Sequence, residues 1–306
     1  MSGIFSLLFL FLTMPLLSTS AQAAPCCSGA VVMPTLITTD SKAQLAGRLM
    51  GTQAVGRSRM DGTSVFHRDG NTDNTVLWEL AGAYALSPRW QIHGAVPVSL
   101  RARGIDSLKE NHTGLGDVSA GGAFEALEEL LFNPYKPRVW VFMDVTMPTG
   151  RSAYDDITPL AASVHGRGSW AATMGAFAGK TWGGWDAALS AQHGRSLPSR
   201  HDVNGRSVLV RPGAVTALTA AGGHSFGELR LGLSVGPTWE QRTMSDYSSS
   251  RDTTDRLWWT VGAQASLMAD DHWSFTASYN DQTLLGPTYN AVLGRSMGLA
   301  AIRRFD

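Results

Sequence analysis

The sequence contains only two cysteines, Cys26 and Cys27, and they are adjacent. Because there is no third cysteine, neither can cross-link the fold internally. Their spacing also differs from the Cys-x-x-Cys pattern of redox sites. We therefore expect a local structural role, in which the pair forms a vicinal disulfide, stays as free thiols or bridges to another chain.

Charge and long apolar segments are also scarce. Only 16% of the residues are charged and the formal net charge is zero, which argues against nucleic acid as a partner. Beyond Ala23, a glycine, serine, threonine or charged residue interrupts every hydrophobic run, so no later segment can cross a bilayer as a helix. The mature chain is therefore expected to be either a secreted protein or a β-barrel. The eight histidines lie far apart without metal-ligand spacing, and we predict neither a metal site nor a cofactor.

An apolar run opens the sequence, from Ile4 to Leu17, and the small-x-small triplet Ala21-Gln22-Ala23 follows it. This order is typical of a secretory signal peptide that is cleaved after Ala23. The run is shorter than the roughly 20 residues that a membrane-spanning helix needs. We therefore predict three segments, which are a signal peptide at 1–23, a periplasmic N-terminal segment at 24–42 and one barrel domain at 43–306.

The stretch WDAALSAQHGRS, from Trp185 to Ser196, alternates apolar and polar residues with a period of two. Such alternation predicts a strand with one apolar and one polar face. The same period recurs along the mature chain and predicts twelve strands, at about 43–58, 75–86, 90–103, 115–131, 137–149, 168–181, 185–197, 207–222, 226–240, 256–269, 272–284 and 293–305.

The connections between these strands alternate in length. Long polar loops are predicted at 59–74, 104–114, 150–167, 198–206, 241–255 and 285–292, and tight turns at 87–89, 132–136, 182–184, 223–225 and 270–271. This alternation predicts an all-β fold, an up-and-down antiparallel transmembrane barrel with long loops at one end and tight turns at the other. Greek-key sandwiches give no such regularity. In the barrel, the apolar faces contact lipid and the even strand count places both termini at the turn end.

Three stretches of the sequence resemble those of a known family. They are HTGLGDVSAGGAFEAL from His112, VFMDVTMPTGRS from Val141 and GRGSWAATMG from Gly166. They resemble the outer-membrane β-barrel proteins grouped with the MetA-pathway phenol-degradation transporters, and the Cys-Cys start resembles an uncharacterised subgroup of these barrels. The resemblance implies export to the bacterial outer membrane, insertion into its lipid by the barrel-assembly machinery, and passage of small solutes, hydrophobic or aromatic. The family motif residues are Gly114, Gly116, Asp117, Pro148, Thr149 and Gly150.

Both motifs also have a structural interpretation, which we favour over ligand binding. Glycines at 114 and 116 permit a tight bend where the chain re-enters the barrel, and Asp117 can accept backbone N–H bonds. The Pro148-Thr149-Gly150 motif ends a predicted strand, where the hydrogen-bond ladder stops and proline is tolerated.

Polar residues on the inward faces are the candidates for the lumen and for a solute path. Twelve strands enclose more space than eight, whose interior side chains fill, and less than an open porin of sixteen. We therefore expect a narrow or plugged lumen, in which these residues either pack against one another or line a path. The set comprises Glu79, His93, Arg101, Asp144, Asp186, Gln192, Glu228, Arg230 and Gln264.

No catalytic motif is recognised in the sequence. Asp155-Asp156 and His165 share one predicted loop and His201-Asp202 lies in the next, and we interpret them as solvated loop charges. Ser190 and His193 share a strand but fall on opposite faces. We therefore predict no catalytic residues. The leading hypothesis is a passive pore or transporter for small solutes, ahead of a structural or surface-interaction barrel and of a barrel enzyme.

Overall fold

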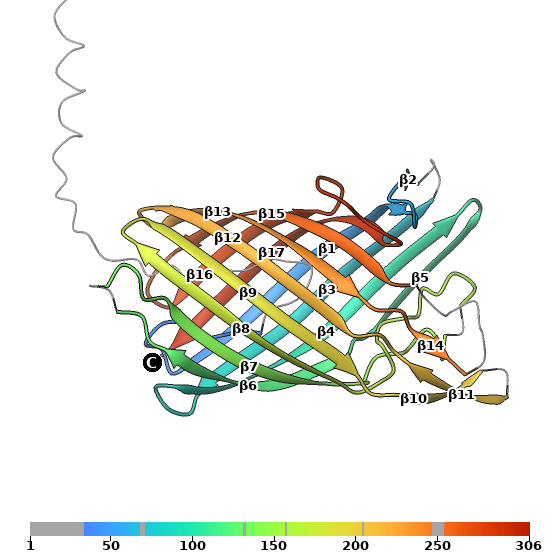
Figure 1. Ribbon diagram of the computed structural model, residues 1–306, viewed down its shortest axis with the longest axis horizontal. Helices are drawn as coiled ribbons and strands as arrows, with labels where there is room; N and C mark the ends of the chain where they lie inside the picture. The colour runs from blue at the N-terminus through green and yellow to red at the C-terminus, as the bar shows by residue number, and fades with distance from the viewer. Residues whose placement is uncertain (1–33, 68–70, 131–132, 157, 204, 247–253) are drawn as a thin grey trace, which may run out of the picture.

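The computed structural model describes residues 34–67, 71–130, 133–156, 158–203, 205–246 and 254–306. The predicted signal peptide and the two cysteines lie outside these ranges. No helix in the described ranges is long and apolar enough to cross a membrane. Figure 1 shows the strands wrapped side by side around one axis, as a single barrel.

The strands are β1 (Ala43–Ser58), β2 (Ser64–Phe66), β3 (Thr72–Ala85), β4 (Trp90–Ile105), β5 (Leu108–Leu115), β6 (Val118–Leu127), β7 (Arg138–Met147), β8 (Ala171–Trp182), β9 (Trp185–Ser196), β10 (Ser199–Val203), β11 (Arg206–Arg211), β12 (Val215–Phe226), β13 (Leu229–Glu240), β14 (Met244–Ser245), β15 (Arg256–Met268), β16 (Trp273–Asp281) and β17 (Val292–Phe305). β5 and β6 form one wall strand that is interrupted at Gly116 and Asp117. β2 is a short addition to β1, and β10, β11 and β14 form a separate sheet.

Pairing between β1 and β17 closes the wall. Ala43 pairs with Phe305 at one end and Arg57 with Val292 at the other, with one register shift between Ala54 and Gly56. All wall pairs are antiparallel, and tight turns join the strands at the end that holds Ala43 and Phe305, on the left of Figure 1. The predicted fold class, an up-and-down barrel of about twelve strands, is confirmed.

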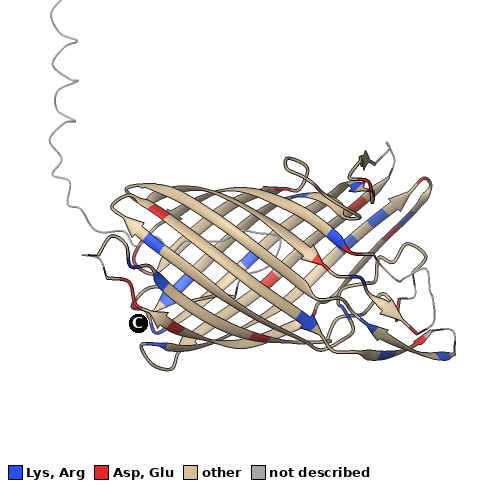
Figure 2. Cartoon of the chain, in the orientation of Figure 1, with Lys and Arg blue, Asp and Glu red and all other residues tan. Residues whose placement is uncertain are grey.

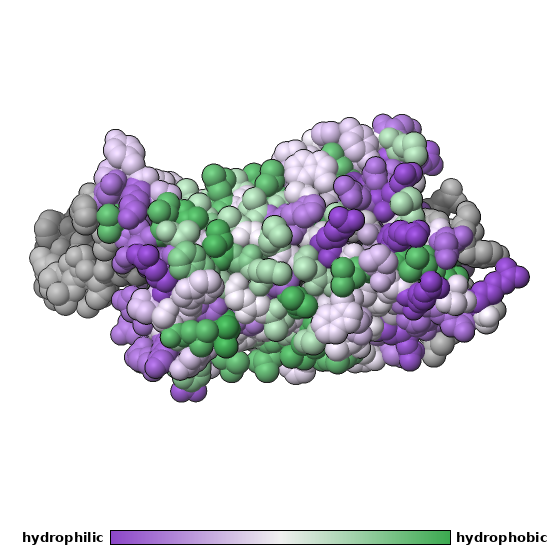
Figure 3. Space-filling view, turned by 60° about the horizontal axis from the view of Figure 1, so that its bottom comes forward, coloured by the Kyte–Doolittle hydropathy of each residue, from purple (hydrophilic) through white to green (hydrophobic). Residues whose placement is uncertain are grey.

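Side chains alternate between a lipid-type outer face and a buried inner face. Leu189 is 63% exposed, whereas Asp186 on the same strand is 6% exposed. Figure 3 shows the result as a band of hydrophobic side chains around the middle of the barrel, with hydrophilic residues toward both ends. In Figure 2 charged residues occur both in the loops and turns and as separate positions along the strands. An apolar outer band is what a strand barrel needs in order to sit in lipid.

Two segments that we predict as loops contain hairpins instead. Residues 104–114 belong to the β4–β5 hairpin, and residues 198–206 belong to the β10–β11 hairpin. Both hairpins extend beyond the wall at the loop end (Figure 1). Strands that extend beyond the lipid need no apolar outer face. The strands of these two hairpins are therefore polar and do not show the apolar alternation by which the wall strands were predicted.

The predicted strand at 207–222 is wrong. Its first part is β11, Pro212 and Gly213 interrupt the pairing, and the wall strand β12 begins only at Val215. The following turn therefore lies at Gly227 and Glu228 instead of at 223–225, and Gly227 has a positive φ of 63° that suits glycine.

The two faces of β13 give a direct test of the wall. Leu233 is 69% exposed on the outer face, and its neighbour Ser234 faces the interior and is half-buried. Leu233→Arg places a charge against lipid near the strand centre and should cost about 2–4 kcal/mol. We expect it to reduce the folded, heat-modifiable fraction on a gel, whereas Ser234→Arg should assemble much better. Equal behaviour of the two variants would contradict the assignment of faces.

Candidate functional site

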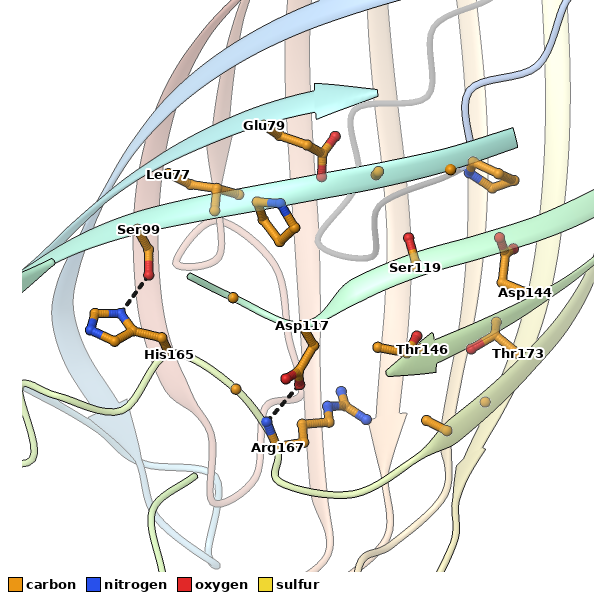
Figure 4. A pocket seen from close by; sticks show the side chains of 18 of the residues that line it. Leu77, Glu79, Ser99, Asp117, Ser119, Asp144, Thr146, His165, Arg167 and Thr173 are labelled. Carbon is orange, nitrogen blue, oxygen red and sulfur yellow. Dashed lines mark hydrogen bonds between the residues drawn. The ribbon is translucent and has the colours of Figure 1, made fainter. Parts of the chain in front are cut away.

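The two family motifs bind to each other across the loop end of the barrel. Asp117 Oδ1 accepts the backbone N–H of Gly150 at 2.9 Å, and Asp117 Oδ2 accepts that of Arg167 at 2.7 Å. Thr149 Oγ1 donates to the carbonyl of Gly116 at 2.6 Å and accepts the N–H of Val118 at 3.0 Å. We call residues 148–170, which link β7 to β8, the inner loop. Asp117 thus holds the inner loop near both of its ends, and Figure 4 shows the bond to Arg167.

Glycine is required here by the space available. A Cβ on Gly166 would lie 2.3 Å from Asp117 Oδ1, and one on Gly150 would lie 2.9 Å from the Cα of Gly166. A Cβ on Gly114 would lie 2.3 Å from the ring of His165. A tight bend was predicted at Gly114 and Gly116, but neither has a positive φ. They serve instead to let the inner loop approach the wall closely.

His165 attaches the C-terminal part of the inner loop to the wall. Its Nδ1 lies 2.7 Å from Ser99 Oγ on β4, and its Nε2 lies 2.9 Å from His112 Nδ1 on β5. Burial lowers the pKa of the His165 imidazole, and the nearby His112, Arg101 and Arg151 lower it further. This lowered pKa favours the neutral imidazole in the docked loop.

The N-terminal segment, residues 34–42, enters the barrel from the turn end. Ile37 is 4% exposed, and its N–H donates to Gln91 Oε1 at 2.7 Å. Arg48 donates to Thr35 Oγ1 at 3.0 Å, and Arg138 donates to the carbonyl of Thr38. Inward-facing polar side chains of the wall thus supply partners for the backbone of these residues, which form the described part of the N-terminal segment predicted at 24–42.

An apolar cluster fills the interior beside this segment. Its members are Ala123, Trp140, Phe142, Phe177 and Ala188, each at most 4% exposed, and Leu36 of the N-terminal segment packs against it. The predicted narrow or plugged lumen is thus narrow toward the turn end. Between the N-terminal segment and the inner loop lies a cavity of about 540 Å³ (Figure 4).

Four of the predicted lumen residues line the cavity. Arg48 donates to Glu79 at 2.7 Å, and His93 Nε2 lies 2.6 Å from Asp144 Oδ1. Gln192 lines the same cavity from β9. The sequence analysis did not single out Arg48, although the alternation in β1, where Leu45 and Leu49 face outward, places it inside.

The other predicted lumen residues lie elsewhere. Asp186 and Arg230 form a buried pair near the turn end, with oxygen to nitrogen distances of 2.5 and 2.7 Å. Arg101 contacts Asp73 near the loop end, and Gln264 is buried on β15. Glu228 is a correction, since it sits exposed in the β12–β13 turn and does not face the lumen.

The polar loop residues form a second cluster outside the cavity. His201 lies between Ser199 Oγ, 2.8 Å from Nε2, and Asp155, 3.3 Å from Nδ1. Ser152 Oγ also donates to Asp155 at 2.5 Å. Asp202 caps its own hairpin by accepting the N–H of Gly205. These bonds tie the β10–β11 hairpin to the inner loop, so the charges are more ordered than the predicted solvated ones.

Two further expectations concern catalysis and metals. Ser190 is buried on the inner face of β9, and His193 is exposed on the outer face, where it bonds to Thr216. In the described part of the chain, no three His, Cys, Asp or Glu side chains group in a way that suits a metal ion.

Substitution of Asp117 tests how the inner loop is held. Asp117→Asn keeps the shape but replaces one acceptor by a donor that faces a backbone N–H, which should cost about 1–3 kcal/mol of docking. We expect faster tryptic cleavage in the inner loop, at Arg151 or Arg167, because cleavage follows the population of the undocked loop. Asp271→Asn, in an exposed turn, is the control. Unchanged cleavage in Asp117→Asn would show that the carboxylate does not hold the loop.

Docking of the inner loop should also weaken in acid. The pKa of His165 is lowered in the docked loop and returns to about 6.5 when the loop is released, so the released form binds the proton more readily. Docking is therefore favoured above about pH 6.5 and is lost progressively below it. Hydrogen exchange of the loop amides, corrected for intrinsic rates, should show less protection at pH 5 than at pH 8. In His165→Gln the protection of the loop amides should change little between pH 5 and pH 8. If protection in wild type were also independent of pH, His165 would not control docking of the inner loop.

Comparison with known proteins agrees with this fold. The sequence profile of the family described as the MetA-pathway of phenol degradation matches residues 43–284. No curated protein sequence matches the chain. An outer membrane channel from Pseudomonas putida F1 is similar in structure, with a TM-score of 0.69, 15% identity, and 92% of this chain and 100% of that chain covered.

Two other solved structures are less similar. The β domain of the Bordetella autotransporter BrkA has a TM-score of 0.51 at 12% identity, covering 87% of this chain and 100% of that chain. The Ralstonia pickettii toluene transporter TbuX has a TM-score of 0.44 at 10% identity, covering 88% and 90%, which is too low to support an argument. At these identities the first two show the fold alone. The family match covers most of the barrel and confirms the resemblance, so the chain belongs to the MetA-pathway of phenol degradation family.

Proposed function

We propose that the chain is a passive channel or transporter for small solutes in the bacterial outer membrane. The cavity inside the closed barrel carries this proposal, because the inner loop bounds it on one side and the N-terminal segment on the other. Its volume of about 540 Å³ falls in the range of small-molecule sites, roughly 300–1,000 Å³. A barrel wall with an apolar outer band supports a place in lipid.

The wall of the cavity favours a small hydrophobic or aromatic solute that also carries a polar group. Leu77, Pro97 and Val215 contribute apolar surface, and Glu79 and His93 contribute polar atoms. Such mixed walls hold an apolar body and fix its orientation through a few polar contacts. The description of the family names phenol degradation, and phenol is an aromatic ring with one hydroxyl group.

The N-terminal segment would have to move for a solute to leave at the turn end. The side chains that bond to its first residues are Gln91, Arg48 and Arg138. A neutral bond such as that of Gln91 is worth about 0.5–1.5 kcal/mol net, and one from a charged arginine about 1.5–3 kcal/mol. A displaceable segment is consistent with slow or gated passage.

The remaining elements of the proposal follow from the sequence. A cleaved signal peptide would export the chain, the barrel-assembly machinery would insert it, and outer-membrane lipid would surround its wall. We assign it no catalytic residue, no cofactor and no nucleic-acid partner.

A structural or surface-interaction barrel is the second candidate. The apolar cluster and the N-terminal segment favour it, because together they fill the interior toward the turn end. Conductance of the purified full chain in planar bilayers separates the two functions, since a closed barrel passes no current.

Removal of the N-terminal segment gives a sharper test. Deletion of residues 34–38 removes the contacts to Gln91 and Arg138 and should raise single-channel conductance, because the interior widens at the turn end. Tyr135→Ala, at an exposed turn position, should conduct like wild type. If wild type and the deletion variant both assemble yet neither conducts ions or passes small sugars into liposomes, the structural barrel becomes the better account.

A further inference from the structure

The carboxylates that line the cavity all have partners. Glu79 is paired with Arg48, and Asp144 is paired with His93. Asp117 accepts the backbone N–H groups of Gly150 and Arg167. The acidic side of the cavity is therefore satisfied by the protein itself.

The arginines that line the cavity are not all paired with carboxylates of the protein. Two arginines line the cavity, Arg48 and Arg167, and Arg48 is paired. Arg167 is exposed, and no carboxylate in the described part of the chain lies within 4.0 Å of its guanidinium. Figure 4 shows this side chain extending from the inner loop into the cavity. The cavity thus presents one guanidinium whose fork of donors is open to a ligand.

The backbone that carries this guanidinium is held in place. The N–H of Arg167 donates to Asp117 at 2.7 Å, and a Cβ on the preceding Gly166 would strike Asp117, so the loop packs tightly here. An arginine on an anchored backbone loses less freedom on binding than one on a mobile loop.

Hydroxyl groups complete the polar side of the cavity. Ser119 on β6 pairs in register with Thr146 on β7, and Thr173 on β8 pairs with Asp144. All three side chains face inward and line the cavity with Arg167 (Figure 4). Hydroxyl donors beside a guanidinium suit the oxygens of a carboxylate, for which the planar arginine fork has the matching geometry.

We propose that Arg167 binds the carboxylate of a small amphipathic organic acid, whose apolar part lies on the cavity wall formed by Leu77, Pro97 and Val215. This inference rests on the proposed function and narrows its solute class to organic anions. Arg167 then acts as the selectivity residue of the channel, because a neutral solute of the same size makes only a weaker, uncharged hydrogen bond to the guanidinium.

Binding and conductance of the full chain test the proposal together. Calorimetry in detergent should show that benzoate binds wild type about tenfold more tightly than Arg167→Gln, the loss expected when a charge-assisted contact is removed. Benzyl alcohol, a neutral molecule of similar size, should not distinguish the two proteins. Arg167→Lys should retain part of the affinity, and Arg200→Gln, exposed on β10 away from the cavity, should behave as wild type.

The possible outcomes separate this inference from the proposed function. Heat-modifiable migration first establishes that each variant is folded. If wild type conducts but does not bind benzoate, or if Arg167→Gln binds it equally well, the assignment of Arg167 is overturned and the channel stands. If inorganic phosphate binds as tightly as benzoate, the organic-acid class is overturned. Absence of conductance in both wild type and the variant lacking residues 34–38 would instead remove the proposed function.

Discussion

Asp117 accepts one backbone N–H from near each end of the inner loop, and these two hydrogen bonds determine where the loop lies. Hydrogen bonds to a carboxylate acceptor are stronger than those between neutral groups. The loop position in turn brings His165 against Ser99 and places Arg167 at the cavity. Without these two hydrogen bonds the barrel wall would still close, but the cavity would have no boundary at the loop end.

The interior is polar, yet its charges are mostly compensated. Arg48 with Glu79, His93 with Asp144, and Arg230 with Asp186 each join side chains from different wall strands. An isolated buried charge is expensive, whereas a paired and hydrogen-bonded one is tolerated. Pairing across strands therefore lets a barrel of this width carry charges in its lumen while the outer face stays apolar.

The wall was predictable from the sequence, and the contents of the barrel were not. Period-two alternation gave twelve strands and the inward position of Glu79 and His93, because the side-chain period of a strand is local. The same rule gave Glu228 the parity of the buried Arg230, but Glu228 lies in the turn before β13 begins at Leu229, so it does not face inward. The bond from Asp117 to Gly150 and the path of Ile37 to Gln91 join residues far apart in sequence, and no local pattern records them. Only the motif glycines Gly114 and Gly150 indicate this packing in the sequence, because a Cβ at either position would collide with residues of the inner loop.

The N-terminal segment immediately precedes β1, the strand that closes the wall against β17. Its partners inside, Gln91 and Arg138, belong to β4 and β7, which are made long before β17 during synthesis. The segment is joined to β1 and bonded to strands that are made before β17. It is therefore most simply enclosed when β17 pairs with β1, and it need not be inserted into a closed barrel afterwards. The folded protein would then reflect the order of assembly, because residues 34–42 lie inside a wall that β17 completes last.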